Sequence, residues 1–305
     1  MHHAGAVGDF ITTLPAIRLW RQNNRNSRLV FLGKAATGRL GLKSGYFDEA
    51  LDIDRAAYSA FFSTDISAAL VAFLKKFDTA ILFSATDSPL VSVIKQAGVF
   101  NIFQQLPRPT DHRHVVGYHL ELFKGLYGLA EPDYPVINVL RGDGDQSGTQ
   151  PIVLHHGSGS LRKNWPTGSF SSLAKRLRGQ GHSIFWIQGP ADLSPPATNE
   201  DNVFKSDDLW ACAKLLSRAH LYVGNDSGIT HLAAAVGCKT IALFGASNPI
   251  VWAPFGPHVQ VITSSTDCGP CHMQPQTVDD CGRQCMAAID VGHVFQQCDT
   301  LLKES

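Results

Sequence analysis

The feature that most constrains the fold is an alternation of short apolar runs with helical patterns, which occurs twice along the chain. In the first half, apolar runs at 28–32 and 79–83 predict strands. Between them, residues 66–76 have the apolar spacing of a helix, with Asp65 as its N-cap, and 116–126 predict a second amphipathic helix. Strands that alternate with helices favour a parallel sheet. The first half therefore predicts an α/β domain.

The second half repeats the pattern after a polar stretch. Residues 141–150, R-G-D-G-D-Q-S-G-T-Q, contain no apolar side chain and predict a linker. Beyond it, strands are predicted at 151–156, 183–189, 220–224 and 239–245, and helices at 169–178, 208–218 and 229–237. We therefore expect two Rossmann-like domains, 1–145 and 151–305, with parallel sheets facing a central cleft. In sheets of this kind, ligands bind beyond the carboxyl ends of the strands.

Composition excludes several classes of protein. The formal net charge is zero, with 26 basic and 26 acidic residues, so no overall field favours nucleic acid and any anion must be bound locally. No apolar run reaches the roughly 18 residues of a membrane span, and the N-terminus lacks the pattern of a secretory signal. Seven cysteines, an odd number, favour a reducing compartment. These features predict a soluble cytoplasmic protein.

The most informative motif is V-G-N-D-S-G-I-T-H at 223–231, between a predicted strand and a predicted helix. Gly224 and Gly228 let the backbone turn and approach a ligand, and the N–H groups of the new helix favour an anion such as a pyrophosphate. We expect Ser227 and His231 to face that anion, and Asp226 to bind sugar hydroxyls or loop N–H groups. The alternative is an N-cap and turn with no ligand.

A second motif, H-H-G-S-G-S-L-R-K-N-W-P at 155–166, also follows a predicted strand. Gly157, Ser158 and Gly159 form a loop suited to an anion, and Arg162 and Lys163 follow at once. A donor that carries two phosphates needs cationic charge near its leaving group. The alternative is a solvated turn with two surface cations.

The third motif is G-A-V-G-D-F-I-T-T at 5–13, before a predicted helix. Gly5 and Gly8 flank a loop, and Asp9 lies in the first turn of the helix. A carboxylate at this position can accept a proton from an incoming hydroxyl. The alternative is an N-cap, and the helix N-terminus would also lower the pKa of Asp9 and weaken it as a base.

Four cysteines are close in sequence near the C-terminus, in C-G-P-C and C-G-R-Q-C at 268–285. Two pairs at short spacing in a reduced protein suggest a tetrahedral zinc site formed by Cys268, Cys271, Cys281 and Cys285. The spacing is not that of a standard zinc ribbon, and the alternative is a set of buried thiols. We assign no metal.

Taken together, the motifs resemble those of glycosyltransferase family 9, the bacterial lipopolysaccharide heptosyltransferases. The matching segments are G-A-V-G-D-F-I-T-T-L-P-A-I-R, G-S-G-S-L-R-K-N-W-P, V-G-N-D-S-G-I-T-H-L-A-A-A-V-G and A-L-F-G-A-S-N-P-I-V-W-A-P-F-G. They occur in the family's order and spacing over nearly the whole chain. The resemblance implies a GT-B fold, in which the N-terminal domain binds the acceptor and the C-terminal domain binds the donor. It also allows the last helix to pack back on the N-terminal domain.

The resemblance further implies an inverting transfer, without metal or cofactor, from ADP-heptose or a related nucleotide-diphosphate sugar. The acceptor is expected to be a lipid-linked saccharide of the inner core, at the cytoplasmic face of the inner membrane, with peripheral attachment. Asp9 corresponds to the family's proposed base and Lys163 to its phosphate-contacting lysine. The donor-binding set is Gly8, Ser158, Lys163, Asp226, Ser227, Gly228 and His231.

The chain departs from the family pattern at two places. Family members begin with a strand of several apolar residues, whereas only Met1, His2, His3 and Ala4 precede the first loop here. Family members often have a donor-contacting glutamate after a G-P turn, and in G-P-A-D-L here Asp192 is the candidate substitute. Two other functions are therefore considered: a nucleotide-sugar epimerase, and a non-catalytic protein that binds nucleotide sugars.

Overall fold

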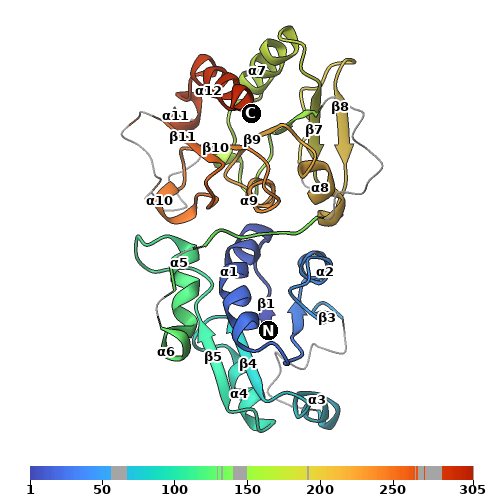
Figure 1. Ribbon diagram of the computed structural model, residues 1–305, viewed down its shortest axis with the longest axis vertical. Coiled ribbons are helices and arrows are strands. Elements are labelled where there is room, and N and C mark those ends of the chain that lie inside the picture. The colour runs from blue at the N-terminus through green and yellow to red at the C-terminus, as the bar shows by residue number, and fades with distance from the viewer. Residues whose placement is uncertain are drawn as a thin grey trace. The chain divides into compact units, whose positions relative to one another are not determined.

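The computed structural model describes residues 1–305 except 56–66, 129, 132, 140–149, 191, 265, 267–270, 272–283 and 305. The chain forms two compact units, Met1–Pro132 and Asp133–Ser305 (Figure 1). Most of the predicted linker, 141–150, lies outside the described residues, as does the predicted N-cap Asp65. The domain boundaries drawn from the sequence therefore stay predictions.

The first unit contains a parallel sheet of five strands. Their bounds are β1 (His2–His3), β2 (Val30–Gly33), β3 (Glu49–Asp52), β4 (Thr79–Phe83) and β5 (Asn101–Gln105). The order across the sheet is β3-β2-β1-β4-β5, and every neighbouring pair is parallel. The strands predicted at 28–32 and 79–83 are confirmed as β2 and β4.

The short β1 occupies the centre of this sheet. His2 pairs with Leu32 on one side and Leu82 on the other, and His3 pairs with Gly33 and Phe83. The few residues before the first loop thus form the central strand, because β2 and β4 supply hydrogen-bonding edges on both sides of it.

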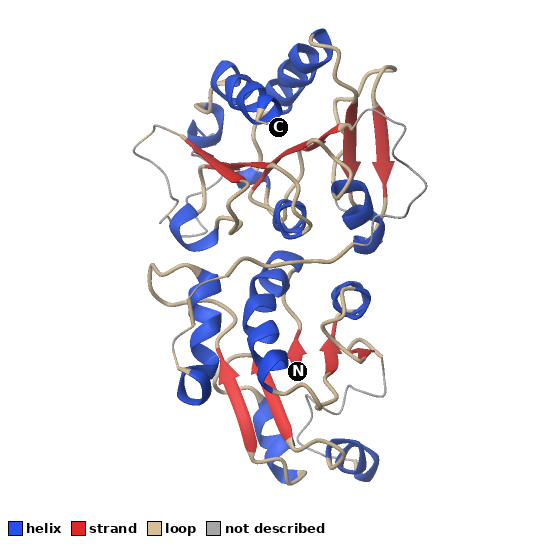
Figure 2. Ribbon diagram, viewed as in Figure 1, coloured by secondary structure: helices blue, strands red, loops and turns tan. Residues whose placement is uncertain are grey.

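Helices cover both faces of the first sheet (Figure 2). They are α1 (Val7–Asn23), α2 (Ala35–Lys43), α3 (Ala68–Leu74), α4 (Pro89–Gln96), α5 (Val115–Leu120) and α6 (Lys124–Tyr127). Because side chains alternate along a strand, Leu32 and Leu82 pack against α3 and α4. Phe31 and Phe83, on the opposite face, contact rings of α1 and α5.

The single helix predicted at 116–126 is wrong in one respect, because the structure divides this segment. Helix α5 ends at Leu120, a 3-10 turn follows over Glu121–Phe123, and α6 begins at Lys124. Phe123 is fully buried and has a non-helical backbone (φ −109°, ψ 11°). The helix is therefore interrupted where the Phe123 ring is buried. The amphipathic spacing of residues 116–126 alone did not indicate this interruption.

The second unit contains a parallel sheet of six strands. They are β6 (Ile152–His155), β7 (Ile184–Gln188), β8 (Asn202–Lys205), β9 (Leu221–Asn225), β10 (Thr240–Phe244) and β11 (Val259–Thr263). The order is β11-β10-β9-β6-β7-β8. The accompanying helices are α7 (Thr167–Gly179), α8 (Leu209–Leu216), α9 (Gly228–Ala235), α10 (Pro249–Trp252), α11 (Gln284–Ala287) and α12 (Val291–Lys303). The elements predicted in this half are confirmed as β6, β7, β9, β10, α7, α8 and α9.

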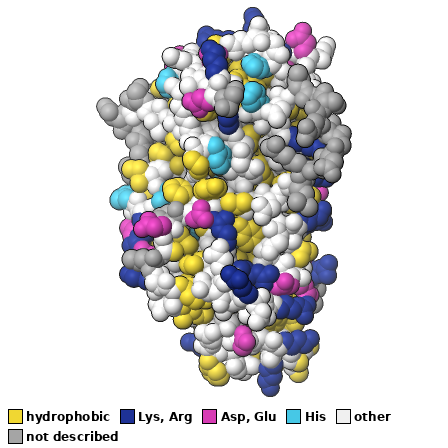
Figure 3. Space-filling model, viewed as in Figure 1, with side chains coloured by type: hydrophobic (Ala, Val, Ile, Leu, Met, Phe, Trp, Pro, Cys, Tyr) yellow, Lys and Arg dark blue, Asp and Glu magenta, His cyan; other side chains and the backbone are white. Residues whose placement is uncertain are grey.

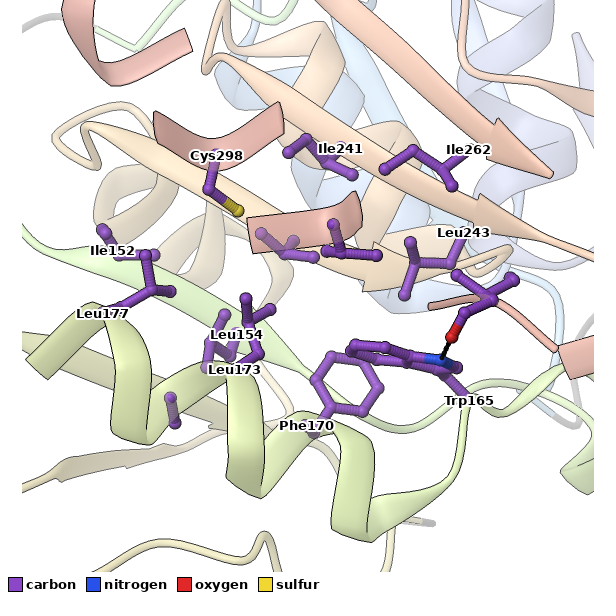
Figure 4. Packing of buried hydrophobic residues seen from close by; sticks show 14 of the residues in the cluster. Ile152, Leu154, Trp165, Phe170, Leu173, Leu177, Ile241, Leu243, Ile262 and Cys298 are labelled. Carbon is purple, nitrogen blue, oxygen red and sulfur yellow. Dashed lines mark hydrogen bonds between the residues drawn. The ribbon is translucent and has the colours of Figure 1, made fainter. Parts of the chain in front are cut away.

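The core of the second unit lies between its sheet and the pair α7 and α12, which pack against each other. Figure 4 shows Phe170, Leu173 and Leu177 of α7 facing side chains of the strands, with Cys298 of α12 beside them. The indole N–H of Trp165 donates to the carbonyl of Ile289 at 3.0 Å, the dashed line in that view. This bond fixes the segment that leads from the second motif into α7.

Both sheets reverse their strand order once, between β1 and β4 in the first unit and between β6 and β9 in the second. Ligands of open parallel sheets bind outside the carboxyl ends of the strands at such a point. Asp9 follows β1, and the two polar motifs of the second half follow β6 and β9. The topology therefore brings each predicted site residue close to a reversal point.

The surface carries charges of both signs. Acidic and basic side chains both appear on each unit in the face drawn in Figure 3, in keeping with the zero net charge. Among the described residues, no helix combines the length and apolarity that crossing a bilayer requires.

Candidate functional site

Asn225 joins the two polar loops of the second unit. It ends β9 and is fully buried, and its amide Nδ2 donates to the carbonyl of His156 at 2.8 Å. Its Oδ1 accepts the backbone N–H of Trp165 at 2.9 Å. The loop after β6 is thereby held at both ends against the end of β9. The sequence motif did not indicate this role of Asn225, because a single Asn in a turn motif has many possible partners.

The ion pair of Lys163 and Asp226 connects the same two loops. Lys163 ends a 3-10 turn, Leu161–Lys163, and its Nζ donates to Asp226 Oδ2 at 2.6 Å. The hydroxyl of Ser247 donates to the same oxygen at 2.5 Å. Asp226 is almost buried (side chain 8% exposed), whereas Lys163 is 36% exposed. The structure thus brings two predicted site residues together and adds Ser247, which the motifs did not single out.

Ser227 is the N-cap of α9. Its Oγ accepts the backbone N–H of Thr230 at 3.3 Å, so the capping alternative describes its local geometry correctly. Gly228 is the first residue of the helix, and the buried His231 follows one turn later. The N-terminus of α9 therefore follows Asp226 in the sequence, with Ser227 between them.

Ser227, His155 and Asp192 form a series of polar contacts. The ring Nε2 of His155 donates to Asp192 Oδ2 at 2.9 Å, and Ser227 Oγ lies 3.4 Å from His155 Nδ1. The same Asp192 oxygen accepts the N–H of Gly189 at 2.8 Å. Burial alone would raise the pKa of Asp192, but the hydrogen bonds from His155 and Gly189 and the charge on His155 lower it below its usual value.

Asp192 also explains why residue 157 is a glycine. A Cβ on Gly157 would overlap the Asp192 carboxylate, and its three nearest neighbours would all be Asp192 atoms. The Asp192 carboxylate therefore lies directly against the loop after β6. The sequence suggested Asp192 for this role, but its contact with His155 could not be predicted from spacing.

Ser158 contacts its own loop. Its Oγ lies 2.6 Å from Asn164 Oδ1 and 2.7 Å from the carbonyl of Ser160, and it accepts the N–H of Ser160 at 3.2 Å. These contacts shape the turn that leads to Lys163. Ser158 thus has a clear role in loop geometry.

In the first unit, Asp9 lies in the first turn of α1, two residues after the helix begins at Val7. The N-cap is Ala6, so the N-cap alternative for Asp9 is wrong. Gly8 precedes it in the same turn. The Arg108 guanidinium lies 3.4 Å from Asp9 Oδ2, and the Asp9 side chain is 16% exposed. Asp9 is therefore a partly accessible carboxylate beside a cation at the reversal point of its sheet.

The zinc hypothesis is only partly covered by the structure. Cys268 and Cys281 lie outside the described residues. Cys271 and Cys285 lie within the described residues, and Cys285 is buried. Within the described part of the chain, no group of three or more His, Cys, Asp or Glu side chains is placed to hold a metal. Both interpretations of the cysteines thus stay open.

Solved structures show which class of protein has this fold. "E. coli ADP-heptose lps heptosyltransferase II" superposes with a TM-score of 0.78 at 19% identity, covering 99% of this chain and 97% of that one. "E. coli heptosyltransferase WaaC with ADP" superposes with a TM-score of 0.68 at 16% identity, covering 98% of each chain. The two Rossmann-like units in series therefore define a GT-B glycosyltransferase fold, as predicted.

The sequence identifies the family. The model of glycosyltransferase family 9 (heptosyltransferase) matches residues 39–281, and the chain belongs to this family. Lipopolysaccharide heptosyltransferase 1 of Pseudomonas aeruginosa is 32% identical over 130 residues, which cover 41% of this chain and 37% of that protein. The chain thus matches about a third of the length of its curated relatives.

Proposed function

We propose that this chain is an inverting, metal-independent glycosyltransferase that moves a heptose from an ADP-heptose donor to a hydroxyl of the lipopolysaccharide inner core. Family membership supports the reaction class. The observation that supports the donor site is the position of Lys163, whose ammonium contacts Asp226 in the loop between β9 and the N-terminus of α9. A cation beside a helix N-terminus is suited to a diphosphate.

The proposed donor site uses the second unit. The Lys163 ammonium either moves from Asp226 toward the phosphates or donates to both Asp226 and a phosphate oxygen. The Ser247 hydroxyl keeps the Asp226 carboxylate hydrogen-bonded in either case. The N–H groups at the start of α9 face the diphosphate, with Gly228 allowing close approach. His231 and the Ser227 hydroxyl complete the set. Ser158 supports it through the loop that presents Lys163.

In the proposed reaction, Asp9 removes the proton of the acceptor hydroxyl, which attacks the anomeric carbon from the face opposite the leaving group. The bond to the diphosphate breaks, and its negative charge is stabilised by Lys163, His231 and the N-terminus of α9. The acceptor is a lipid-linked saccharide, and we propose that the protein meets it at the inner membrane by peripheral contact.

Binding of free nucleotides tests the donor site. Calorimetry with ADP, UDP, GDP and dTDP is expected to give tight binding of ADP alone. The Ser227→Ala/His231→Ala double variant should lose it, whereas His293→Ala, an exposed histidine of α12, should not. Because Ser227 caps α9, each variant is first checked by thermal melting. Preference for UDP or dTDP would contradict the heptose donor, and no binding by the wild-type chain would contradict the site.

Product analysis separates this proposal from an epimerase. With ADP-heptose and no acceptor, a transferase should leave the donor intact, whereas an epimerase would release a changed free sugar. A chain that binds ADP but produces no transfer with any inner-core acceptor would favour a non-catalytic binding protein.

A further inference from the structure

Two buried histidines of the first unit, His3 and His119, have ring nitrogens without a hydrogen-bond partner among the described residues. His3 is 1% exposed, and among the described residues neither Nδ1 nor Nε2 has a hydrogen-bond partner. His119, on α5, is fully buried; its Nδ1 lies 3.3 Å from Gln105 Oε1, and its Nε2 has no partner within the described chain. Leaving buried polar atoms without hydrogen bonds costs stability, so such atoms point to a role beyond folding.

His3 Nε2 and the Asp9 carboxylate border the same small space. A Cβ placed on Gly5 would lie 2.9 Å from His3 Cε1, 3.2 Å from His3 Nε2 and 3.3 Å from Asp9 Oδ2. A side chain at Gly5 would therefore crowd both the His3 ring and the Asp9 carboxylate. Glycine at this position leaves the space that the imidazole and the carboxylate both face.

The His3 ring is held in place by its surroundings. Its backbone lies in the central strand β1, paired on both sides, and its ring packs against Phe10 and Phe83 at 5.9 and 6.0 Å between centroids. Phe83 in turn contacts the His119 ring edge to face at 5.1 Å. The imidazole cannot turn away from Asp9 without disturbing this aromatic cluster.

Burial keeps the His3 imidazole neutral. Burial lowers the pKa of His3 to about 4, with Asp9 of α1 opposing the shift and His2 and Lys34 adding to it. Burial and the nearby His3 lower the pKa of His119 to about 3. A neutral imidazole has one nitrogen that accepts a hydrogen bond.

We propose that His3 is a positioning residue for Asp9: its Nε2 accepts a hydrogen bond from the Asp9 carboxyl group after Asp9 has taken the acceptor's proton. This inference rests on the proposed transferase function. The acceptor O–H bond breaks, an O–H bond forms on Asp9, and His3 stays neutral. The hydrogen bond stabilises Asp9 in its protonated form, the form that it takes when it has accepted the acceptor's proton.

Two substitutions of His3 test this role. His3→Leu is expected to lower kcat at least about tenfold, with the KM for donor unchanged. It should also shift the acid limb of the kcat–pH profile to lower pH, because the hydrogen bond that favours protonated Asp9 is lost. His3→Gln, which keeps a neutral acceptor, should restore most of kcat. The matched control is His2→Leu on the same strand, which should leave kcat and the acid limb unchanged. Wild-type kcat and an unmoved acid limb in His3→Leu would overturn the inference.

A readout without turnover separates this inference from the proposed function. In the full chain with ¹⁵N-labelled histidine, Asp9→Asn is expected to move the His3 ring nitrogen resonances and to lower the His3 pKa further. Unchanged resonances and pKa would overturn the inference at any level of activity. A wild-type chain that transfers no heptose, but shows this coupling, would count against the transferase function and leave the proposed interaction of His3 with Asp9 supported.

Discussion

The ammonium of Lys163 lies 2.6 Å from the carboxylate of Asp226, so the loops after β6 and β9 are joined by an ion pair at the reversal point of the second sheet. Ser247 binds the same carboxylate from the loop after β10. Three loops thus converge on one nearly buried aspartate.

We expect Lys163→Met to lower kcat about 100- to 1,000-fold and to weaken ADP binding at least about tenfold, because it removes the cation proposed for the diphosphate. It should also destabilise the fold by about 1–3 kcal/mol, since, within the described chain, Asp226 would keep Ser247 as its one side-chain partner. Lys175→Met, an exposed lysine of α7, is the control. Wild-type ADP affinity in Lys163→Met would contradict the assignment.

Asn225 provides a second test, because its buried amide holds the loop after β6 at two points. Asn225→Leu should destabilise the protein by about 2–4 kcal/mol, since the backbone groups of Trp165 and His156 would lose their partner. Urea unfolding measures the change, and ADP calorimetry should show weaker binding. A stable variant with normal ADP affinity would show that the amide does not organise the site.

The contact of Gly157 with Asp192 predicts a coupling between substitutions. Gly157→Ala should cost about 1–3 kcal/mol because the new methyl group overlaps the Asp192 carboxylate. In an Asp192→Ala background the same change should cost less than about 0.5 kcal/mol. A double-mutant cycle in thermal or urea unfolding gives the difference. Equal costs in the two backgrounds would rule out this contact as the reason for the glycine.

The buried histidines predict a pH dependence of stability. Burial lowers the pKa of His2 and His3 to about 4 and that of His119 to about 3, against an ordinary value of 6.5. The unfolded chain therefore binds more protons between pH 6.5 and about 4, and stability falls as pH falls through this window. Each histidine contributes up to about 1.4 kcal/mol per pH unit. The free energy of unfolding of His119→Leu should depend less steeply on pH, and an unchanged slope would contradict the assignment.

The regular elements of the second unit could be predicted because their strands are continuous apolar runs, such as Ile152–His155 and Thr240–Phe244, with amphipathic helices between them. Strand β1 could not be predicted from its residues, His2 and His3, which are polar and only two in number. Its strand state depends on hydrogen bonds from β2 and β4, which are distant in sequence.

The candidate site shows the same limit. The motifs selected Lys163, Asp226 and Ser227 by residue type and position, and the structure brings these three together. The sequence did not indicate Asn225 as a link between loops or Ser247 as a partner of Asp226, because both contacts join segments from different strands. Nor did it single out His3, whose buried ring is defined by packing against α1 and β4.

The most direct test of the account compares heptose transfer from ADP-heptose by the wild-type chain and Asp9→Asn, with ADP binding measured for both. The account predicts transfer by the wild-type chain and a kcat at least about 100-fold lower in Asp9→Asn. The ADP dissociation constant should be unchanged within about twofold, because Asp9 is not among the proposed donor residues, which apart from Gly8 belong to the second unit. Transfer at the wild-type rate by Asp9→Asn would contradict its role as the base, and the proposed mechanism with it.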